Sequence, residues 1–353
     1  MSANDVAAAL YRDLPGALWV HPQRIDLLRD ALLMVRVDPR TLEQASFMDD
    51  RIVTRDAAAG WFNWSQVAEC LGAGSAATPA HYVFHVGHCG STLLSRLLGE
   101  LGIAQLREPL PLRTLAEVQA DLDAFESRWS RATFAARLPL IAALFDRGDG
   151  PRLVKATSFC NDLAPALLAT NSTRRATIIY TRLRPYLANV LAGSNSRLDL
   201  LAAAPQRLKR LSARTGSPVG RLHEMSPGVL AGMSWITETA SLAATLDAER
   251  PGRMLAVDFD QFLVDVRAAL RRVADHVAAG IEDAVIARAA ASPTLTRYSK
   301  SPEHAYDREL RRAVLDDAER RFGEEIRAGL SWCTQLAARQ PVVARALALF
   351  DQP

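Results

Sequence analysis

The sequence predicts an α/β protein with three α/β/α layers and a mostly parallel central sheet. Short apolar runs with the length of buried strands recur along the chain, at 81–86, 151–157, 176–180 and 254–258. Longer segments with helical spacing of apolar residues separate these runs, which is the alternation expected of strand–helix–strand units. We expect helices on both faces of the sheet, an N-terminal extension and a helical C-terminal tail.

The composition is that of an ordinary globular protein. Of the 353 residues, 49% are hydrophobic and 23% are charged, and the net charge is only +3. The arginines are scattered and are not interleaved with aromatic residues, so we expect no nucleic-acid partner. The N-terminus lacks a basic-then-apolar signal pattern, and no apolar run approaches the length of a membrane span. We therefore expect a cytoplasmic protein with no membrane partner, and the oligomeric state stays open.

The four cysteines, Cys70, Cys89, Cys160 and Cys333, form no CxxC pair and show no metal-ligand spacing. We expect reduced thiols and no metal site.

The N-terminal residues 1–79 are predicted to form a separate extension or subdomain, followed by the main domain at 80–353. The stretch 73–79, AGSAATP, has the composition of a linker. The segment 23–35, QRIDLLRDALLMV, has helical spacing and predicts a helix. We find no chemical motif in this part, so its expected role is to pack on the core or to shield a substrate.

The most informative stretch is 81–99, HYVFHVGHCGSTLLSRLLG. An apolar strand is followed by a turn from Gly87 to Thr92, and then by leucines at helical spacing. The free N–H groups of the first helical turn and the helix dipole favour an anion at this turn. Gly90 allows the main chain to approach the anion, and the hydroxyls of Ser91 and Thr92 add donors. The stretch therefore predicts a phosphate- or sulfate-binding P-loop.

This turn departs from the Walker pattern G-x-x-x-x-G-K-[ST], because no lysine precedes the serine to grip the β- and γ-phosphates of ATP. It resembles the phosphosulfate-binding loop of the sulfotransferase family, commonly written R-S-G-T-T-L. The residues on these six positions are His88, Cys89, Gly90, Ser91, Thr92 and Leu93. The resemblance is to a divergent, bacterial-type member. It implies 3′-phosphoadenosine 5′-phosphosulfate as co-substrate, bound by Gly87 and the residues through Thr92. For the hexapeptide alone, a turn that merely caps a helix explains the pattern equally well.

The resemblance extends to three candidate catalytic residues. Glu108 precedes Pro109 at a place similar to that of the carboxylate base in the family, and the chain between the loop and Glu108 has room for a helix and a return turn. Lys155 ends an apolar strand where the family often has K-T-P, although here the sequence is K-A-T. His88 takes the place of the loop cation, a role that it can fill only when protonated. The alternatives are a loop glutamate paired with a nearby arginine and a solvated strand-end lysine.

The strand at 176–180 ends in T-R-L-R-P. Sulfotransferases have a similar strand that ends in R-[DN]-P and is followed by a serine, and this arginine and serine hold the 3′-phosphate of the cofactor. Here Arg182 and Arg184 bracket the expected position, and the serine position is apolar. The resemblance therefore implies Arg182 or Arg184, with Asn189 or Ser194 in place of the serine.

Charged residues near the C-terminus complete the pattern. Arg297 and Lys300 correspond by position and charge to a basic segment that folds over the nucleotide in the family. Asp258 and Asp260 are expected to cap a helix or to pair with arginines, and not to bind magnesium. The charges of R-E-L-R-R and A-E-R-R in the C-terminal helices are expected to be solvated.

The order of these pieces over residues 80–300 predicts an enzyme, a sulfotransferase. It would move a sulfuryl group from 3′-phosphoadenosine 5′-phosphosulfate to a hydroxyl of an unidentified small-molecule or peptide acceptor, with no metal required. Two alternatives stay open. One is a P-loop kinase that uses ATP, against which the missing Walker lysine counts. The other is a non-catalytic nucleotide-binding protein, because the loop cation and the 3′-phosphate serine both deviate.

Overall fold

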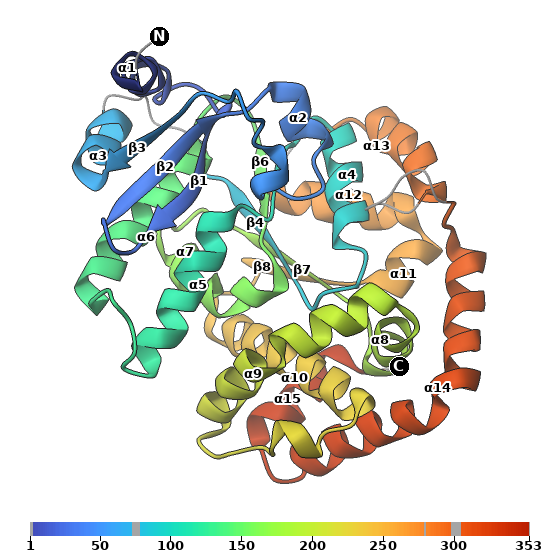
Figure 1. The fold of residues 1–353 in the computed structure, drawn as a ribbon. Helices are drawn as coiled ribbons and strands as arrows, with labels where there is room; N and C mark the ends of the chain where they lie inside the picture. The colour runs from blue at the N-terminus through green and yellow to red at the C-terminus, as the bar shows by residue number, and fades with distance from the viewer. Residues whose placement is uncertain (1–2, 73–77, 279, 298–304, 353) are drawn as a thin grey trace. The chain divides into compact units, whose positions relative to one another are not determined.

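The computed structural model describes residues 3–72, 78–278, 280–297 and 305–352 (Figure 1). Its strands are β1 (Val20–Asp26), β2 (Ala31–Arg36), β3 (Ala59–Asn63), β4 (His81–His85), β5 (Ala104–Arg107), β6 (Arg152–Lys155), β7 (Ala176–Tyr180) and β8 (Met254–Asp258). The longer helices are α1 (Ala3–Asp13), α3 (Trp64–Gly72), α4 (Ser91–Glu100), α5 (Leu110–Asp123), α6 (Arg131–Asp146), α8 (Leu183–Ala192), α9 (Ser194–Thr215), α10 (Pro227–Ala248), α12 (Val266–Val277), α13 (Asp283–Ala290), α14 (Arg308–Ala337) and α15 (Pro341–Phe350). Short helical turns are α2 (Pro39–Gln44), α7 (Ala164–Ala169), α11 (Phe259–Val264) and the 3₁₀ segments η1 (Asp50–Ile52), η2 (Ser158–Leu163), η3 (Leu222–Glu224) and η4 (Pro293–Thr296).

The central sheet confirms the predicted α/β class with its mostly parallel sheet. Its strand order is β5–β6–β4–β7–β8, and β6 pairs in parallel with both β4 and β5. Parallel neighbours require crossover connections, which the intervening helices supply. All four predicted strands are present, and the predicted helical C-terminal tail is formed by α14 and α15. The edge strand β5 was not predicted. It is only four residues long, and its sequence, AQLR, has no continuous apolar run.

The N-terminal part contains a second sheet, in which β1, β2 and β3 are antiparallel. The helix predicted at 23–35 is therefore wrong. Asp26 Oδ1 accepts the N–H groups of Leu28 and Arg29 at 2.9 and 3.0 Å and closes a turn between two strands. In β2, the buried Leu32 and Met34 alternate with half-buried residues, so the same leucine-rich pattern also suits a strand.

The chain divides into two compact units. Unit 1 comprises residues 1–84, 94–176 and 270–289, and unit 2 comprises 85–93, 177–269 and 290–353. The division expected between residues 79 and 80 stays a prediction.

Helix α10 forms the centre of unit 2. It packs against α8, α9, α14 and α15, and most of its residues are buried (Figure 1). Its close approach to α14 depends on small residues, because a β-carbon at Gly228 would lie only 1.8 Å from the carbonyl oxygen of Glu325. Glu238, in the middle of α10, is fully buried and accepts hydrogen bonds from Arg210 at 3.0 and 3.1 Å. A buried charge of this kind persists only when it is paired.

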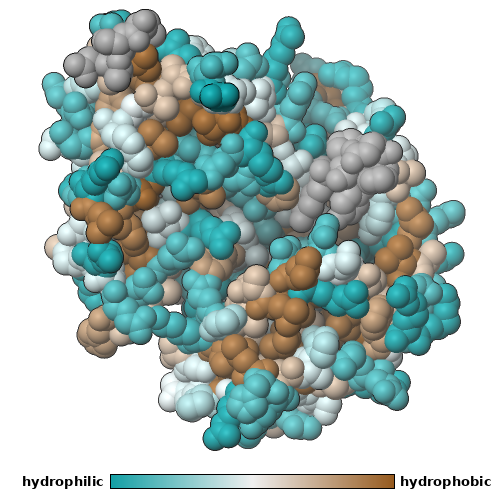
Figure 2. Space-filling model, in the orientation of Figure 1, coloured by the Kyte–Doolittle hydropathy of each residue, from teal (hydrophilic) through white to brown (hydrophobic). Residues whose placement is uncertain are grey.

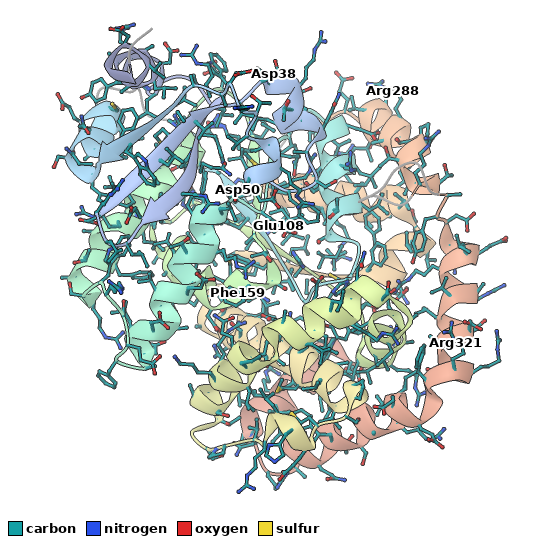
Figure 3. All side chains as sticks on the ribbon, in the orientation of Figure 1. Asp38, Asp50, Glu108, Phe159, Arg288 and Arg321 are labelled. Carbon is teal, nitrogen blue, oxygen red and sulfur yellow. The ribbon has the colours of Figure 1, made fainter. Side chains whose placement is uncertain are left out.

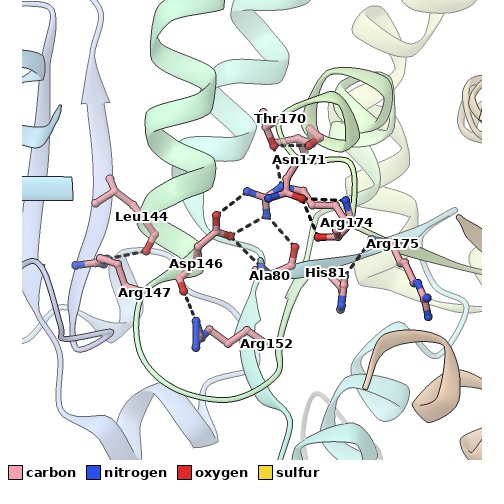
Figure 4. A network of polar contacts seen from close by, with 12 residues as sticks. Ala80, His81, Leu144, Asp146, Arg147, Arg152, Thr170, Asn171, Arg174 and Arg175 are labelled. Atoms are coloured by element: carbon pink, nitrogen blue, oxygen red, sulfur yellow. Dashed lines mark hydrogen bonds and ion pairs between the residues drawn. The ribbon is translucent and has the colours of Figure 1, made fainter. Parts of the chain in front are cut away.

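A second buried ion pair, formed by Asp146 and Arg174, lies in unit 1 (Figure 4). Asp146, at the end of α6, accepts two hydrogen bonds from Arg174 at 2.8 and 2.7 Å and one from the N–H of Ala80 at 2.9 Å. Arg174 also donates to the carbonyl oxygen of Ala80, so the pair joins α6 to the residues just before β4 and β7. The side chain of Arg174 is only 2% exposed.

No helix in the described ranges is both long and apolar enough to cross a membrane. On the face shown in Figure 2, hydrophilic and hydrophobic residues are intermingled.

We predict that Asp146→Ala lowers the free energy of unfolding by about 3–5 kcal/mol, because it leaves the buried guanidinium of Arg174 without its counter-charge. The matched control is Asp123→Ala, which removes an ion pair with Arg131 whose two side chains are both more than half exposed. This control should cost less than about 1 kcal/mol. Urea denaturation of both variants measures the difference, and equal midpoints would show that the Asp146 network is not stabilising.

Candidate functional site

The loop from Gly87 to Gly90 has an unusual main chain. Gly87, His88 and Gly90 have φ values of 82°, 49° and 75°, in the left-handed region. Helix α4 begins directly afterwards at Ser91, so its first-turn N–H groups face the loop, as the sequence predicted. Left-handed residues that alternate with ordinary ones turn successive N–H groups toward a common point, and such concave turns bind anions. The N–H of Gly87 is already used, since it donates to His85 Nδ1 at 3.0 Å.

Two helices of unit 2 hold His88 in this conformation. Asn189 Nδ2, from α8, donates to the carbonyl oxygen of His88 at 2.9 Å. Ser196 Oγ, from α9, lies 3.2 Å from Nδ1 of the imidazole. A hydroxyl can donate to a neutral ring or accept from a protonated one, so this contact suits either protonation state of His88. Asn189, a candidate for holding the 3′-phosphate, thus contacts the main chain of His88, and its role toward a phosphate stays a prediction.

The glycine at position 90 is required by Phe259 as well as by its positive φ. A β-carbon there would lie 2.0 Å from Cε2 of Phe259, the first residue of α11. The missing side chain therefore makes room for an aromatic ring of the protein, in addition to the approach of the main chain to an anion that the sequence predicts.

The two hydroxyl residues at the start of α4 are both buried. Thr92 Oγ1 has no hydrogen-bond partner among the described residues. A buried hydroxyl without a hydrogen-bond partner costs free energy. Its presence therefore indicates that a ligand or a bound water supplies the missing partner. In the first turn of a helix, such a hydroxyl is placed to donate to an anion.

Glu108 and Lys155 meet in unit 1 as an ion pair between Glu108 Oε1 and Lys155 Nζ. They come from the carboxyl ends of the adjacent parallel strands β5 and β6, and the N–H of Glu108 donates to the carbonyl oxygen of Lys155 at 2.6 Å. Lys155 is fully buried, whereas the side chain of Glu108 is 18% exposed; Figure 3 labels Glu108. Lys155 also pairs in register with Val83 of β4, the strand that leads into the loop.

Backbone strain coincides with two of the three predicted catalytic residues. Four non-glycine residues within the described ranges have positive φ: Asp30, His88, Glu108 and Phe125. A left-handed conformation costs a residue with a β-carbon about 1–3 kcal/mol, and such strain collects at functional sites. The strain at His88 and Glu108 therefore adds an independent signal to the sequence prediction.

The two candidate phosphate-binding arginines already have acidic partners in the structure. Arg182 Nε donates to Asp258 Oδ2 at 3.0 Å, and Asp258 also caps α11 through the N–H of Asp260. Arg184 Nη1 lies 3.2 Å from both oxygens of Glu319 in a pair at the surface. An exposed pair contributes little and exchanges readily for a phosphate. Arg182 would have to share its charge with the partly buried Asp258.

The remaining candidates are Ser194, Arg297 and Lys300. Ser194 is exposed at the start of α9, and its neighbour Ser196 makes the contact with His88 instead. Arg297 is exposed, and it forms an isolated β-bridge with Ala305. Lys300 lies outside the described residues. Their assignments stay predictions.

Sequence reasoning missed Arg311, whose segment R-E-L-R-R was expected to be solvated. Its side chain is 3% exposed, and its Nε donates to Asp260 Oδ1 at 2.8 Å. Thr181, directly after β7, donates to Asp260 Oδ2 at 2.7 Å. Burial alone would raise the pKa of Asp260, but the hydrogen bond and charge of Arg311 hold it below its usual value. Asp258 and Asp260 thus cap and pair as predicted, although the partner Arg311 lies too far along the chain to be found by spacing.

All four cysteines lie in the described ranges, and all are buried and without disulfide bonds. Cys89 is fixed in the loop by donating from Sγ to the carbonyl oxygen of Ile179 at 3.2 Å. Within the described ranges, no group of three or more His, Cys, Asp or Glu residues could hold a metal ion.

Comparisons with known proteins give only distant similarities. No protein-family model matches the sequence, and no curated protein matches it. Among solved structures, the chain is similar to the sulfotransferase domain from the curacin biosynthetic pathway, with 12% identity, coverage of 74% of this chain and 99% of that one, and a TM-score of 0.38. It is also similar to the sulfotransferase domain from the Synechococcus PCC 7002 olefin synthase, with 15% identity, coverage of 74% of this chain and 96% of that one, and a TM-score of 0.37. A third similar structure is sulfotransferase STF1 from Mycobacterium tuberculosis H37Rv, with 14% identity, coverage of 73% of this chain and 80% of that one, and a TM-score of 0.37. Such identities and TM-scores do not assign the chain to a family.

We predict that Gly90→Ala destabilises the protein more than Gly102→Ala. Both glycines have positive φ, so each substitution should cost about 1–2 kcal/mol in the backbone. Only Gly90 has a ring where the β-carbon would lie, and the space around Gly102 is open, so Gly90→Ala should cost about 1–3 kcal/mol more. Chemical denaturation measures the two costs. Equal costs would show that the contact with Phe259 does not determine the loop, and a partial recovery in Gly90→Ala/Phe259→Ala would support it.

Proposed function

We propose that this protein is a sulfotransferase that moves the sulfuryl group of 3′-phosphoadenosine 5′-phosphosulfate to an acceptor hydroxyl. The observation that carries the proposal is the loop before α4. It combines left-handed residues, a helix N-terminus and the buried, unpartnered hydroxyl of Thr92. These features suit a bound phosphate or sulfate.

The lack of a Walker lysine favours a phosphosulfate over ATP. In the Walker pattern, a lysine before the serine neutralises the β- and γ-phosphates. Here Gly90-Ser91-Thr92 contains no lysine, and the close contact of Gly90 with Phe259 leaves no room for a side chain at position 90. A kinase would therefore lack its main phosphate-binding cation. The second alternative, a nucleotide-binding protein without catalysis, does not explain the strained Glu108 and its buried lysine partner.

The proposed chemistry needs charge stabilisation and one proton acceptor. In sulfuryl transfer, the acceptor oxygen attacks sulfur while the bond from sulfur to the phosphate oxygen breaks. We propose that the phosphosulfate is bound by the first-turn N–H groups of α4 and by the hydroxyls of Ser91 and Thr92. In this proposal, Lys155 stabilises the negative charge that develops on the leaving phosphate. Glu108 removes the proton from the acceptor hydroxyl.

The surroundings of Lys155 agree with a chemical role. Only three of the 42 lysine and arginine residues of the chain are lysines, and Lys155 is the fully buried one among the described residues. Buried arginines elsewhere, such as Arg147, donate to several main-chain carbonyl oxygens and tie elements together. The compact ammonium of a lysine is less suited to such multiple contacts, and it can turn from one anion to another.

We predict that Glu108→Gln lowers the turnover of 3′-phosphoadenosine 5′-phosphosulfate about 10²–10⁴-fold, because the amide keeps the shape of the side chain but accepts no proton. Turnover is measured as release of adenosine 3′,5′-bisphosphate in the presence of a panel of phenols, sugar alcohols and tyrosine peptides. The affinity for adenosine 3′,5′-bisphosphate should change little.

The matched control is Glu117→Gln, which alters an exposed glutamate on α5 and should leave turnover unchanged. A near-normal rate in Glu108→Gln would remove Glu108 as the base. Phosphate transfer from ATP and magnesium, with no turnover of the phosphosulfate, would contradict the proposed function.

A further inference from the structure

The chain before β3 is fastened to the end of β5 in unit 1. Arg107 Nη1 donates to the carbonyl oxygens of Glu43 and Ala45 at 2.8 and 3.0 Å. The N–H of Met48 donates to the carbonyl oxygen of Arg107 at 2.7 Å. Burial lowers the pKa of Arg107 to about 10, which still leaves it charged at neutral pH. Residues 43–48 are thus held in place directly beside Glu108.

The fastened segment places an aromatic ring against the catalytic pair. Lys155 Nζ lies 5.8 Å from the centroid of the Phe47 ring, and the guanidinium carbon of Arg51 lies 4.6 Å from the same centroid. The charge of Arg51 also acts on Glu108. Asp50, labelled in Figure 3, lies two residues after this segment. A ring in contact with an ammonium stabilises the cation while it displaces water.

We propose that Phe47 covers the Lys155–Glu108 pair and excludes water from it, so that the sulfuryl group passes to the acceptor and not to water. This inference rests on the proposed function. Lys155 is fully buried although its partner Glu108 is partly exposed, so a cover must lie over the lysine itself, and Phe47 has the contact to provide it. Exclusion of water strengthens the electrostatic interactions of a site and prevents hydrolysis of a reactive group.

The side reaction that Phe47 suppresses is hydrolysis of 3′-phosphoadenosine 5′-phosphosulfate. The oxygen of water forms a bond to sulfur as the bond from sulfur to the phosphate oxygen breaks. Glu108 takes a proton from the water and later releases it to solvent. The products are adenosine 3′,5′-bisphosphate and sulfate, and no oxidant or metal takes part.

The scarcity of lysine makes the cover directly measurable. Lys155, Lys209 and Lys300 are the lysines of the chain, so acetylation by sulfo-N-hydroxysuccinimide acetate, followed by mass spectrometry, reports each separately. In the wild type, Lys155 should react much more slowly than Lys209. Phe47→Ala should accelerate acetylation of Lys155 several-fold and leave Lys209 unchanged. Phe47→Leu should stay close to the wild type, because an aliphatic side chain still fills the space.

The same variants test the function of the cover. Without acceptor, Phe47→Ala should release adenosine 3′,5′-bisphosphate and sulfate several-fold faster than the wild type, and Phe47→Leu should not. Phe125→Ala is the control, since this ring is 94% exposed in the same unit. Unchanged acetylation or unchanged hydrolysis in Phe47→Ala would overturn the inference. A wild type that binds adenosine 3′,5′-bisphosphate would show that such a failure leaves the proposed function intact. A wild type that binds neither adenosine 3′,5′-bisphosphate nor 3′-phosphoadenosine 5′-phosphosulfate would contradict both the inference and the proposed function.

Discussion

Phe259 occupies the space that a side chain at position 90 would need. The guanidinium of Arg311 lies over the Phe259 ring, 5.0 Å from its centroid, and pairs with Asp260. Asp258, which caps the helix that begins with Phe259, pairs with Arg182. Phe259 thus packs against Gly90 of the loop, and the acidic residues on either side of it in the sequence form partly buried ion pairs with Arg182 and Arg311. A left-handed loop that is strained in isolation is held in this way by its surroundings.

The fold class and the loop could be predicted because their signals are local. Four strands appear as short apolar runs, and the turn before α4 has its glycines, hydroxyls and leucines within a few residues of one another. The failures have equally local causes. The segment 23–35 satisfies both a helical and a strand pattern, and only the turn closed by Asp26 decides between them. Strand β5 is too short and too polar to be recognised.

The contacts that position the candidate site could not be predicted, because their partners are distant in sequence. Ser196 reaches His88 across 108 residues, and Arg311 reaches Thr181 across 130. Phe47 belongs to a stretch without any motif, and its place beside Lys155 follows from the hydrogen bonds of Arg107 to main-chain carbonyl oxygens. Main-chain acceptors have no sequence signature, so such contacts become visible only in the folded chain.

We propose that the start of α4 binds the phosphosulfate end of the nucleotide, and the substitution Thr92→Val tests this assignment. Valine keeps the shape of threonine and removes a hydroxyl that has no partner in the described structure, so the free protein should be as stable as the wild type or slightly more stable. Calorimetric titration with adenosine 3′,5′-bisphosphate should show affinity reduced about tenfold to a hundredfold, the cost of one charge-assisted hydrogen bond. Unchanged affinity in a stably folded Thr92→Val variant would contradict a phosphosulfate-binding site at the start of α4.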